Sequence, residues 1–123
     1  MQDHRRLRVW QRAQELCVQV YLLTADYPAA ERFGLTAQVR KAAVSVGANI
    51  AESSRRSSRP DKRRILNIAQ GEAAEVMSEL DVACRLRYGG REVAETLVAD
   101  YDALGGSLER LRQRILEGSD DDT

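Results

Sequence analysis

The chain has 123 residues, of which 43% are hydrophobic, and 19 Lys and Arg balance 19 Asp and Glu. This length suffices for one domain with a core that needs no disulfide or metal, and the scarcity of Trp, Phe and Pro favours a helical bundle over a β-sandwich. No apolar run approaches the roughly 18 residues that cross a membrane, and residues 1–12 lack the apolar core of a secretory signal, so we expect a cytoplasmic protein.

Four amphipathic segments follow one another along the chain, each with apolar residues three and four positions apart. They are expected over residues 7–27, 36–52, 59–88 and 93–117. The links between them are short, which favours antiparallel neighbours. The sequence therefore predicts an all-α fold, an antiparallel up-down-up-down four-helix bundle over residues 1–118, followed by a disordered acidic tail over 119–123.

Several residues in and between these segments carry specific expectations. Thr36 is a candidate N-cap for the second helix, and Ser58 for the third. Phe33, in the first link, is expected to fold back onto the end of the bundle. Gly71 and the 105–106 glycine pair lie inside predicted helices, where glycine is unfavourable, so they suggest close helix approach or a bend.

The second predicted helix has two apolar faces. One holds the large residues expected in the bundle core, among them Val39, Val46 and Ile50. The opposite face carries a stripe of small apolar residues at spacings of seven, four and three: Ala37, Val44, Ala48 and Ala51. A surface helix of a monomer needs only one apolar face. The stripe therefore predicts an interface with another subunit, unless the helix is covered on both sides within its own chain.

Charge is unevenly spread along the chain. Up to Arg64 there are 13 Lys and Arg against 6 Asp and Glu, and from Ile65 onward the counts are 6 and 13. Such asymmetry favours a polyanionic partner for the first half or attraction between subunits during self-assembly. The sequence leaves both alternatives open.

The basic residues fall in two clusters that are candidates for contacting nucleic acid. They are Arg5, Arg6, Arg8 and Arg12 near the start, and Arg55, Arg56, Arg59, Lys62, Arg63 and Arg64 between the second and third helices. An antiparallel bundle would bring both clusters to one end. Aromatic stacking platforms are absent from these clusters, which favours contact with the RNA or DNA backbone over base reading.

Catalytic and metal-binding patterns are missing. Glu72, Glu75 and Glu79 share one face of the third helix, but His4 is the only histidine, and a di-iron carboxylate bundle requires Glu-x-x-His from two helices. No serine has a suitable base or nucleophile elbow. Cys17 and Cys84 are expected to be free thiols. We therefore expect no enzyme, metal or cofactor.

Three stretches of the chain resemble a known family: VWQRAQELCVQVYLLT, ERFGLTAQVRKAAVSVGANIAES and RILNIAQGEAAEVMSEL. Together they are similar to the four-helix bundle proteins encoded in 23S ribosomal RNA intervening sequences, over roughly residues 7–117. This sequence departs from the family pattern at Gly47, Ser53 and Glu72, where proline, glycine and serine are usual.

The resemblance carries further expectations. A related branch, the accessory variability determinant of diversity-generating retroelements, pairs with a reverse transcriptase and binds nucleic acid through a basic pentameric ring. The resemblance thus implies a homopentamer, RNA or DNA as a partner, and a reverse transcriptase as a further candidate partner. It also implies structural hydrogen bonds for Asn49, Glu52 and Glu75 at a helix or subunit junction. Two functions remain: a nucleic-acid-binding platform, or a protein-interaction scaffold whose charge asymmetry serves self-assembly only.

Overall fold

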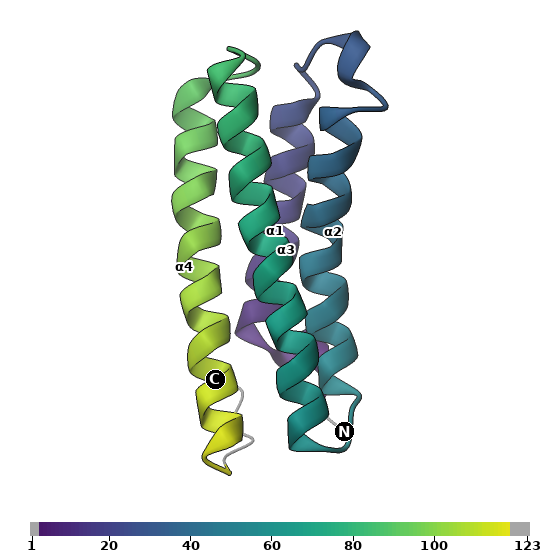
Figure 1. Cartoon of the computed structure of the whole chain (residues 1–123), viewed down its shortest axis with the longest axis vertical. Coiled ribbons are helices and arrows are strands. Elements are labelled where there is room, and N and C mark those ends of the chain that lie inside the picture. The colour runs from purple at the N-terminus through teal and green to yellow at the C-terminus, as the bar shows by residue number, and fades with distance from the viewer. Residues whose placement is uncertain (1–2, 119–123) are drawn as a thin grey trace.

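A computed structural model of the chain describes residues 3–118, and the predicted acidic tail lies outside them. Four long helices run alternately up and down beside one another (Figure 1). They are α1 (Arg8–Thr24), α2 (Leu35–Ser54), α3 (Arg59–Arg85) and α4 (Arg91–Leu116), with the short 3-10 helices η1 (His4–Arg6) and η2 (Ala29–Glu31). The described residues form no strand, so the predicted all-α four-helix bundle is confirmed. None of these helices combines the length and apolarity that a membrane crossing needs.

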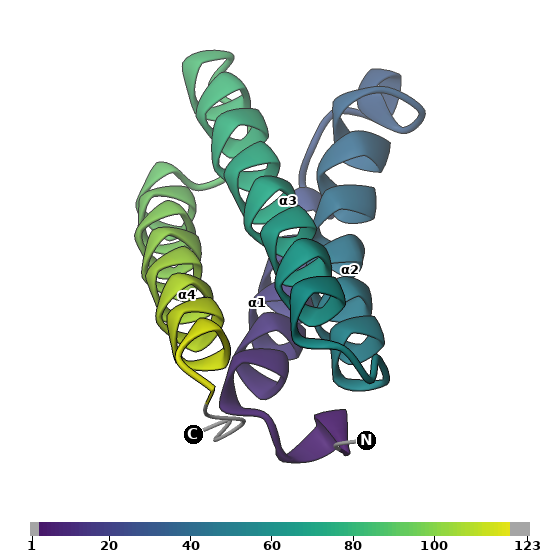
Figure 2. The same ribbon diagram turned by 60° about the horizontal axis from the view of Figure 1, so that its bottom comes forward.

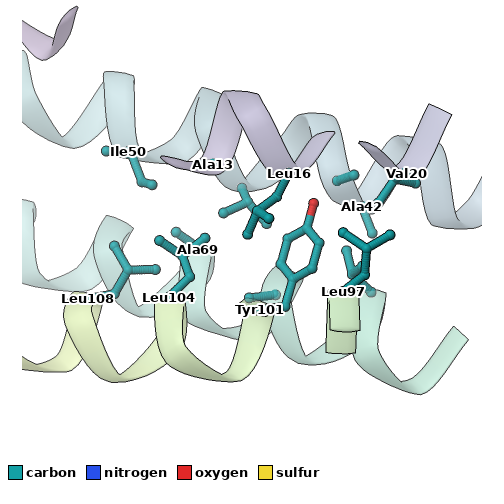
Figure 3. Packing of buried hydrophobic residues seen from close by; sticks show 14 of the residues in the cluster. Ala13, Leu16, Val20, Ala42, Ile50, Ala69, Leu97, Tyr101, Leu104 and Leu108 are labelled. Atoms are coloured by element: carbon teal, nitrogen blue, oxygen red, sulfur yellow. The ribbon is translucent and has the colours of Figure 1, made fainter. Parts of the chain in front are cut away.

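The core follows the predicted helical spacing. In α4 the buried residues from Leu97 to Ile115 recur every three or four positions. Tyr101, the second residue of this series, is fully buried, and Figure 3 shows its hydroxyl oxygen directed toward Leu16 and Val20 of α1. Val93, expected on the same face four residues before Leu97, is instead 48% exposed, and Ala94, three residues before Leu97, is buried in its place.

The start of α2 differs from the prediction. Gly34, not Thr36, is the N-cap residue, and Thr36 is buried in the first turn. The backbone N–H of Leu35 donates to Glu31 Oε1 at 3.1 Å. A carboxylate from the preceding η2 turn thus takes the place of the predicted threonine cap. By contrast, Ser58 caps α3 as expected, since its Oγ accepts from the N–H of Asp61 at 3.3 Å.

Phe33 does not fold back onto the bundle. It is 87% exposed, and only the Arg32 guanidinium lies over its ring, 5.1 Å from the centroid. Tyrosines close this end of the bundle instead: the Tyr27 and Tyr88 rings are 5.7 Å apart, and the Tyr88 hydroxyl donates to Glu31 at 3.1 Å. The prediction was wrong because Tyr27 and Tyr88, in the links that follow α1 and α3, already cover this end of the bundle.

The interior glycines of α3 and α4 are not sites of close approach within the chain. A Cβ added at Gly71 or Gly105 would meet no atom within 4 Å. Both positions lie inside continuous α-helix. The expectation that these glycines admit a neighbouring helix of the same chain is therefore wrong.

Candidate nucleic-acid interface

One end of the bundle collects three basic segments. Because the helices alternate in direction, the start of α1, the link between α2 and α3, and the end of α4 meet there (Figure 2). Residues 5–12, 55–64 and 110–114 hold 13 of the 19 Lys and Arg and one of the 19 Asp and Glu. We call this end, defined by these three segments, the basic end.

Hydrogen bonds join the second of these segments to the third. The Arg63 and Arg112 side chains each donate from Nε to the other residue's carbonyl oxygen, both at 3.1 Å. Arg59 donates to the carbonyl oxygen of Gly118 at 3.0 Å. These contacts join the first turns of α3 to the end of α4, so the second and third segments form one connected surface.

The sequence argument missed the third segment. Arg110, Arg112 and Arg114 lie in the half of the chain that is acidic overall, and the count over that half conceals them. A shorter window would have found them, because residues 107–116 hold three Arg and a single Glu. Basic residues from both halves of the sequence therefore gather at one end of the bundle.

Several candidate arginines are already paired with carboxylates. Arg5 lies 3.0 Å from Asp3, and its hydrogen bonds lower the pKa of Asp3 to about 2. The other pairs are Arg12 with Asp100 at 3.3 Å, Arg64 with Asp61 at 2.9 Å, and Arg56 with Glu52. Exposed pairs of this kind contribute little to stability. Their arginines can therefore exchange a carboxylate for a phosphate at small cost.

Within the two clusters that the sequence singled out, three exposed arginines are in no ion pair among residues 3–118: Arg6, Arg8 and Arg55. They come from both of these clusters. Uncompensated guanidinium groups on an exposed surface are well suited to phosphate oxygens, with which they form charge-assisted hydrogen bonds. These three residues are the strongest candidates for backbone contact.

Two of the predicted contact residues, Lys62 and Arg63, are not exposed. Lys62 is only 8% exposed, because it shares the inner face of α3 with Leu66 and Ala69 at helical spacing. Arg63 uses its guanidinium on the Arg112 carbonyl. The structure therefore removes Lys62 from the exposed candidates, a correction to the sequence prediction, and shows that Arg63 joins α3 to α4.

The acidic residues of α3 lie together but form no metal site. Burial and the neighbouring Glu75 and Glu79 raise the pKa of Glu72, with Lys41 opposing the shift. Burial, then Glu75, raises the pKa of Glu79. Within the described residues no cluster of His, Cys, Asp and Glu could hold a metal ion. The Cys17 and Cys84 thiols are free and half-buried.

The three residues expected to form structural hydrogen bonds do not join helices within the described chain. Asn49 donates to the Ser45 carbonyl at 2.9 Å, one turn back in α2. Glu52 accepts from Arg56 across the end of the same helix. Glu75 is exposed on α3. Their assignment to a subunit junction stays a prediction.

The small apolar stripe of α2 lies on the outside of the bundle. Ala37, Val44 and Ala48 are exposed and Ala51 is half-buried. Val44 is 47% exposed, and Ile68 on the neighbouring α3 is 43% exposed. The alternative in which the chain itself covers both faces of this helix is therefore wrong, and the stripe remains available to another subunit.

Comparison with known proteins agrees with the fold. A family model described as 23S rRNA-intervening sequence protein matches residues 5–110. The chain is also similar to the crystal structure of a protein of unknown function from the S23 ribosomal protein family of Bacteroides thetaiotaomicron. The TM-score is 0.76 at 28% identity, and the match covers 85% of this chain and 98% of that one. None of the curated proteins compared with the chain matches it.

Proposed function

Because this chain belongs to the family of 23S rRNA-intervening sequence proteins, we propose that its basic end binds the sugar-phosphate backbone of RNA or DNA. Binding is the whole of the proposed activity, and no catalytic step is assigned to the chain. The observation that carries this proposal is the convergence of three basic segments, with unpaired Arg6, Arg8 and Arg55 on the resulting surface.

Contact with the backbone, not with bases, follows from the side chains available. Trp10 is the one Trp, Tyr or Phe inside these segments, and it is half-buried against the core with its ring 4.9 Å from His4. Exposed Phe33 belongs to the link at the opposite end of the bundle. Base recognition in single strands requires exposed stacking rings. We therefore expect weak sequence preference and strong dependence on salt.

Self-association would multiply these contacts. The exposed stripe of Ala37, Val44 and Ala48 on α2 supports packing against a second copy, because its small side chains permit close backbone approach. A ring of copies, as the family resemblance implies, would present several basic ends to one nucleic acid. Linked sites of this kind bind far more tightly than single ones.

The alternative function is a protein-interaction scaffold. It is favoured by the same exposed α2 stripe together with the carboxylates that already pair with Arg5, Arg12, Arg56 and Arg64. In that case the charges would serve assembly only. The two functions differ in one observable property, namely the affinity of the intact protein for nucleic acid at low salt.

A matched pair of variants tests the proposal. The first replaces Arg6, Arg8 and Arg55 by Ser, and the control makes the same change at Arg32, Arg85 and Arg91, which lie toward the other end of the bundle. Removing three phosphate contacts should weaken binding of a fluorescent structured RNA and of a duplex DNA by roughly 10- to 100-fold near physiological salt. The control should bind within about twofold of the unmodified protein.

Light scattering must show that both variants keep the oligomeric state of the unmodified protein. Equal loss in both variants would mean that net charge, not the basic end, determines binding. No binding by the unmodified protein at low salt would contradict the proposal and leave the scaffold function.

A further inference from the structure

A cavity of about 320 Å³ lies between the first turns of α1 and the last turns of α4, within the basic end. Four arginines line it, together with Ser107, Asp100 and an inner wall of Val9 and Leu104: Arg8, Arg12, Arg110 and Arg114. We infer that this cavity, the α1–α4 pocket, receives a phosphate group of the bound nucleic acid. The inference rests on the proposed function and assigns it a defined site.

Helical spacing explains why the four arginines converge. Arg8 and Arg12 are four residues apart on α1, as are Arg110 and Arg114 on α4, so each pair projects from one face of its helix. The helices are antiparallel, which places the start of α1 beside the end of α4 (Figure 2). On the same face of α4, Ser107 and Ala103 stand about one and two turns before Arg110, and these small residues leave the space that the guanidinium groups surround.

The lining is positively charged and partly preorganised. Four arginines and one carboxylate, Asp100, give it a formal charge of +3. Asp100 holds Arg12 at 3.3 Å, and Arg110 donates to Ser107 Oγ at 3.0 Å. Arg8 is exposed, with no ion pair among the described residues. Two side chains are therefore held in position while a third is available to a ligand.

The start of α1 adds to the positive potential. Its first turn contains no acidic residue, and no side chain caps it. The positive end of the helix dipole is thus not neutralised by a carboxylate of that turn. An anion in the pocket would be stabilised by this dipole in addition to the arginines.

The chemistry of the walls favours a phosphate group. Guanidinium groups bind phosphate oxygens in a bidentate manner, and a serine hydroxyl donates to the same oxygens. None of the described residues that line the pocket is aromatic, so they offer a base no stacking surface. Inorganic phosphate offers the same chemistry as a backbone phosphodiester, and the experiment must distinguish the two sources.

Three variants separate the pocket from net charge. Arg8→Gln with Arg110→Gln removes two pocket arginines. Arg6→Gln with Arg55→Gln removes two charges from the basic end outside the pocket. Ser107→Leu fills the pocket and leaves every arginine in place. All changed side chains are exposed or half-buried, and circular dichroism should confirm that the three proteins remain helical.

The first measurement is an NMR titration of the full chain with inorganic phosphate at constant ionic strength. We expect saturable changes in chemical shift for Arg8, Ser107 and Arg110 in the unmodified protein, and for the same three residues when Arg6 and Arg55 are replaced. The Arg8→Gln, Arg110→Gln double variant and the Ser107→Leu variant should show no saturable change in chemical shift. Saturation that persists in both pocket variants would overturn the inference.

The second measurement is binding of a fluorescent duplex RNA, with phosphate as competitor. We expect both pocket variants to bind about tenfold more weakly than the unmodified protein, and phosphate to lose its competing effect in them. If the unmodified protein binds RNA and Ser107→Leu binds equally well, the pocket inference fails and the proposed function stands. If phosphate saturates the pocket but RNA does not bind, the proposed function fails and the nucleic-acid source is excluded.

Discussion

The buried hydroxyl of Tyr101 allows a prediction whose sign depends directly on the structure. Tyr101 is fully buried, and its hydroxyl has no hydrogen-bond partner among residues 3–118 (Figure 3). Burying an unsatisfied polar group costs about 1–3 kcal/mol. In Tyr101→Phe that cost disappears, while a void of about 10–15 Å³ costs about 0.3 kcal/mol at about 24 cal/mol per Å³. We expect the free energy of unfolding to rise by about 0.7–2.7 kcal/mol.

The same residue predicts how stability depends on alkaline pH. Burial, with a smaller effect of Cys17, raises the pKa of the Tyr101 hydroxyl well above the ordinary value of 10.0. Above pH 10 the unfolded chain then loses a proton that the folded protein keeps, so folding becomes less favourable. The free energy of unfolding should fall by about 1.4 kcal/mol per pH unit in this range, and Tyr101→Phe should remove that contribution. Burial also raises the pKa of Tyr27 to about 12, so part of the dependence should remain.

Urea unfolding at fixed protein concentration measures both effects. The control is Tyr21→Phe, which removes the same atom from a ring that is 42% exposed and should change stability by less than about 0.5 kcal/mol. If Tyr101→Phe were less stable than the unmodified protein, the hydroxyl would be making a favourable interaction, and the reasoning from an unsatisfied group would be refuted.

Two further substitutions test the outer surface of the bundle. Val44→Glu places a charge in the exposed α2 stripe and should reduce the mass measured by light scattering to that of a smaller species. Val18→Glu, at a 57% exposed site of α1, should leave that mass unchanged. A monomeric unmodified protein would contradict the proposed interface. Gly71→Ala should raise the free energy of unfolding by about 1 kcal/mol in urea, because an added Cβ meets no atom within 4 Å and alanine favours the helix. Loss of stability there would show that another subunit covers this position.

Much of the fold could be predicted from the sequence because each helix carries its own periodic signal. The α4 series from Leu97 to Ile115 and the Ser58 cap both depend on residues close in sequence. The errors lie where residues distant in sequence compete for the same position in the fold. Phe33 is displaced outward because Tyr27 and Tyr88 close that end of the bundle, and Glu31 supplies the contact expected from Thr36.

The candidate site was harder to predict than the fold. The two clusters of the first half were visible as runs of arginine, but Arg110 and Arg114 joined them only through the antiparallel arrangement of α1 and α4. Burial of Lys62 depends on the rotation of the first turn of α3, which the charge count ignores. Runs of charge therefore indicated the correct end of the molecule, whereas the residues at its surface required the structure.

The most direct test of nucleic-acid binding is the salt dependence of the affinity of the unmodified protein for a structured RNA. If Arg6, Arg8 and Arg55 each neutralise one phosphate, a plot of log Kd against log salt should have a slope of at least about 2.7, from about 0.9 per phosphate. The Arg6, Arg8 and Arg55 triple serine variant should lower this slope by about 2.7 for each basic end engaged. A salt-independent affinity, or no binding at low salt, would contradict the account.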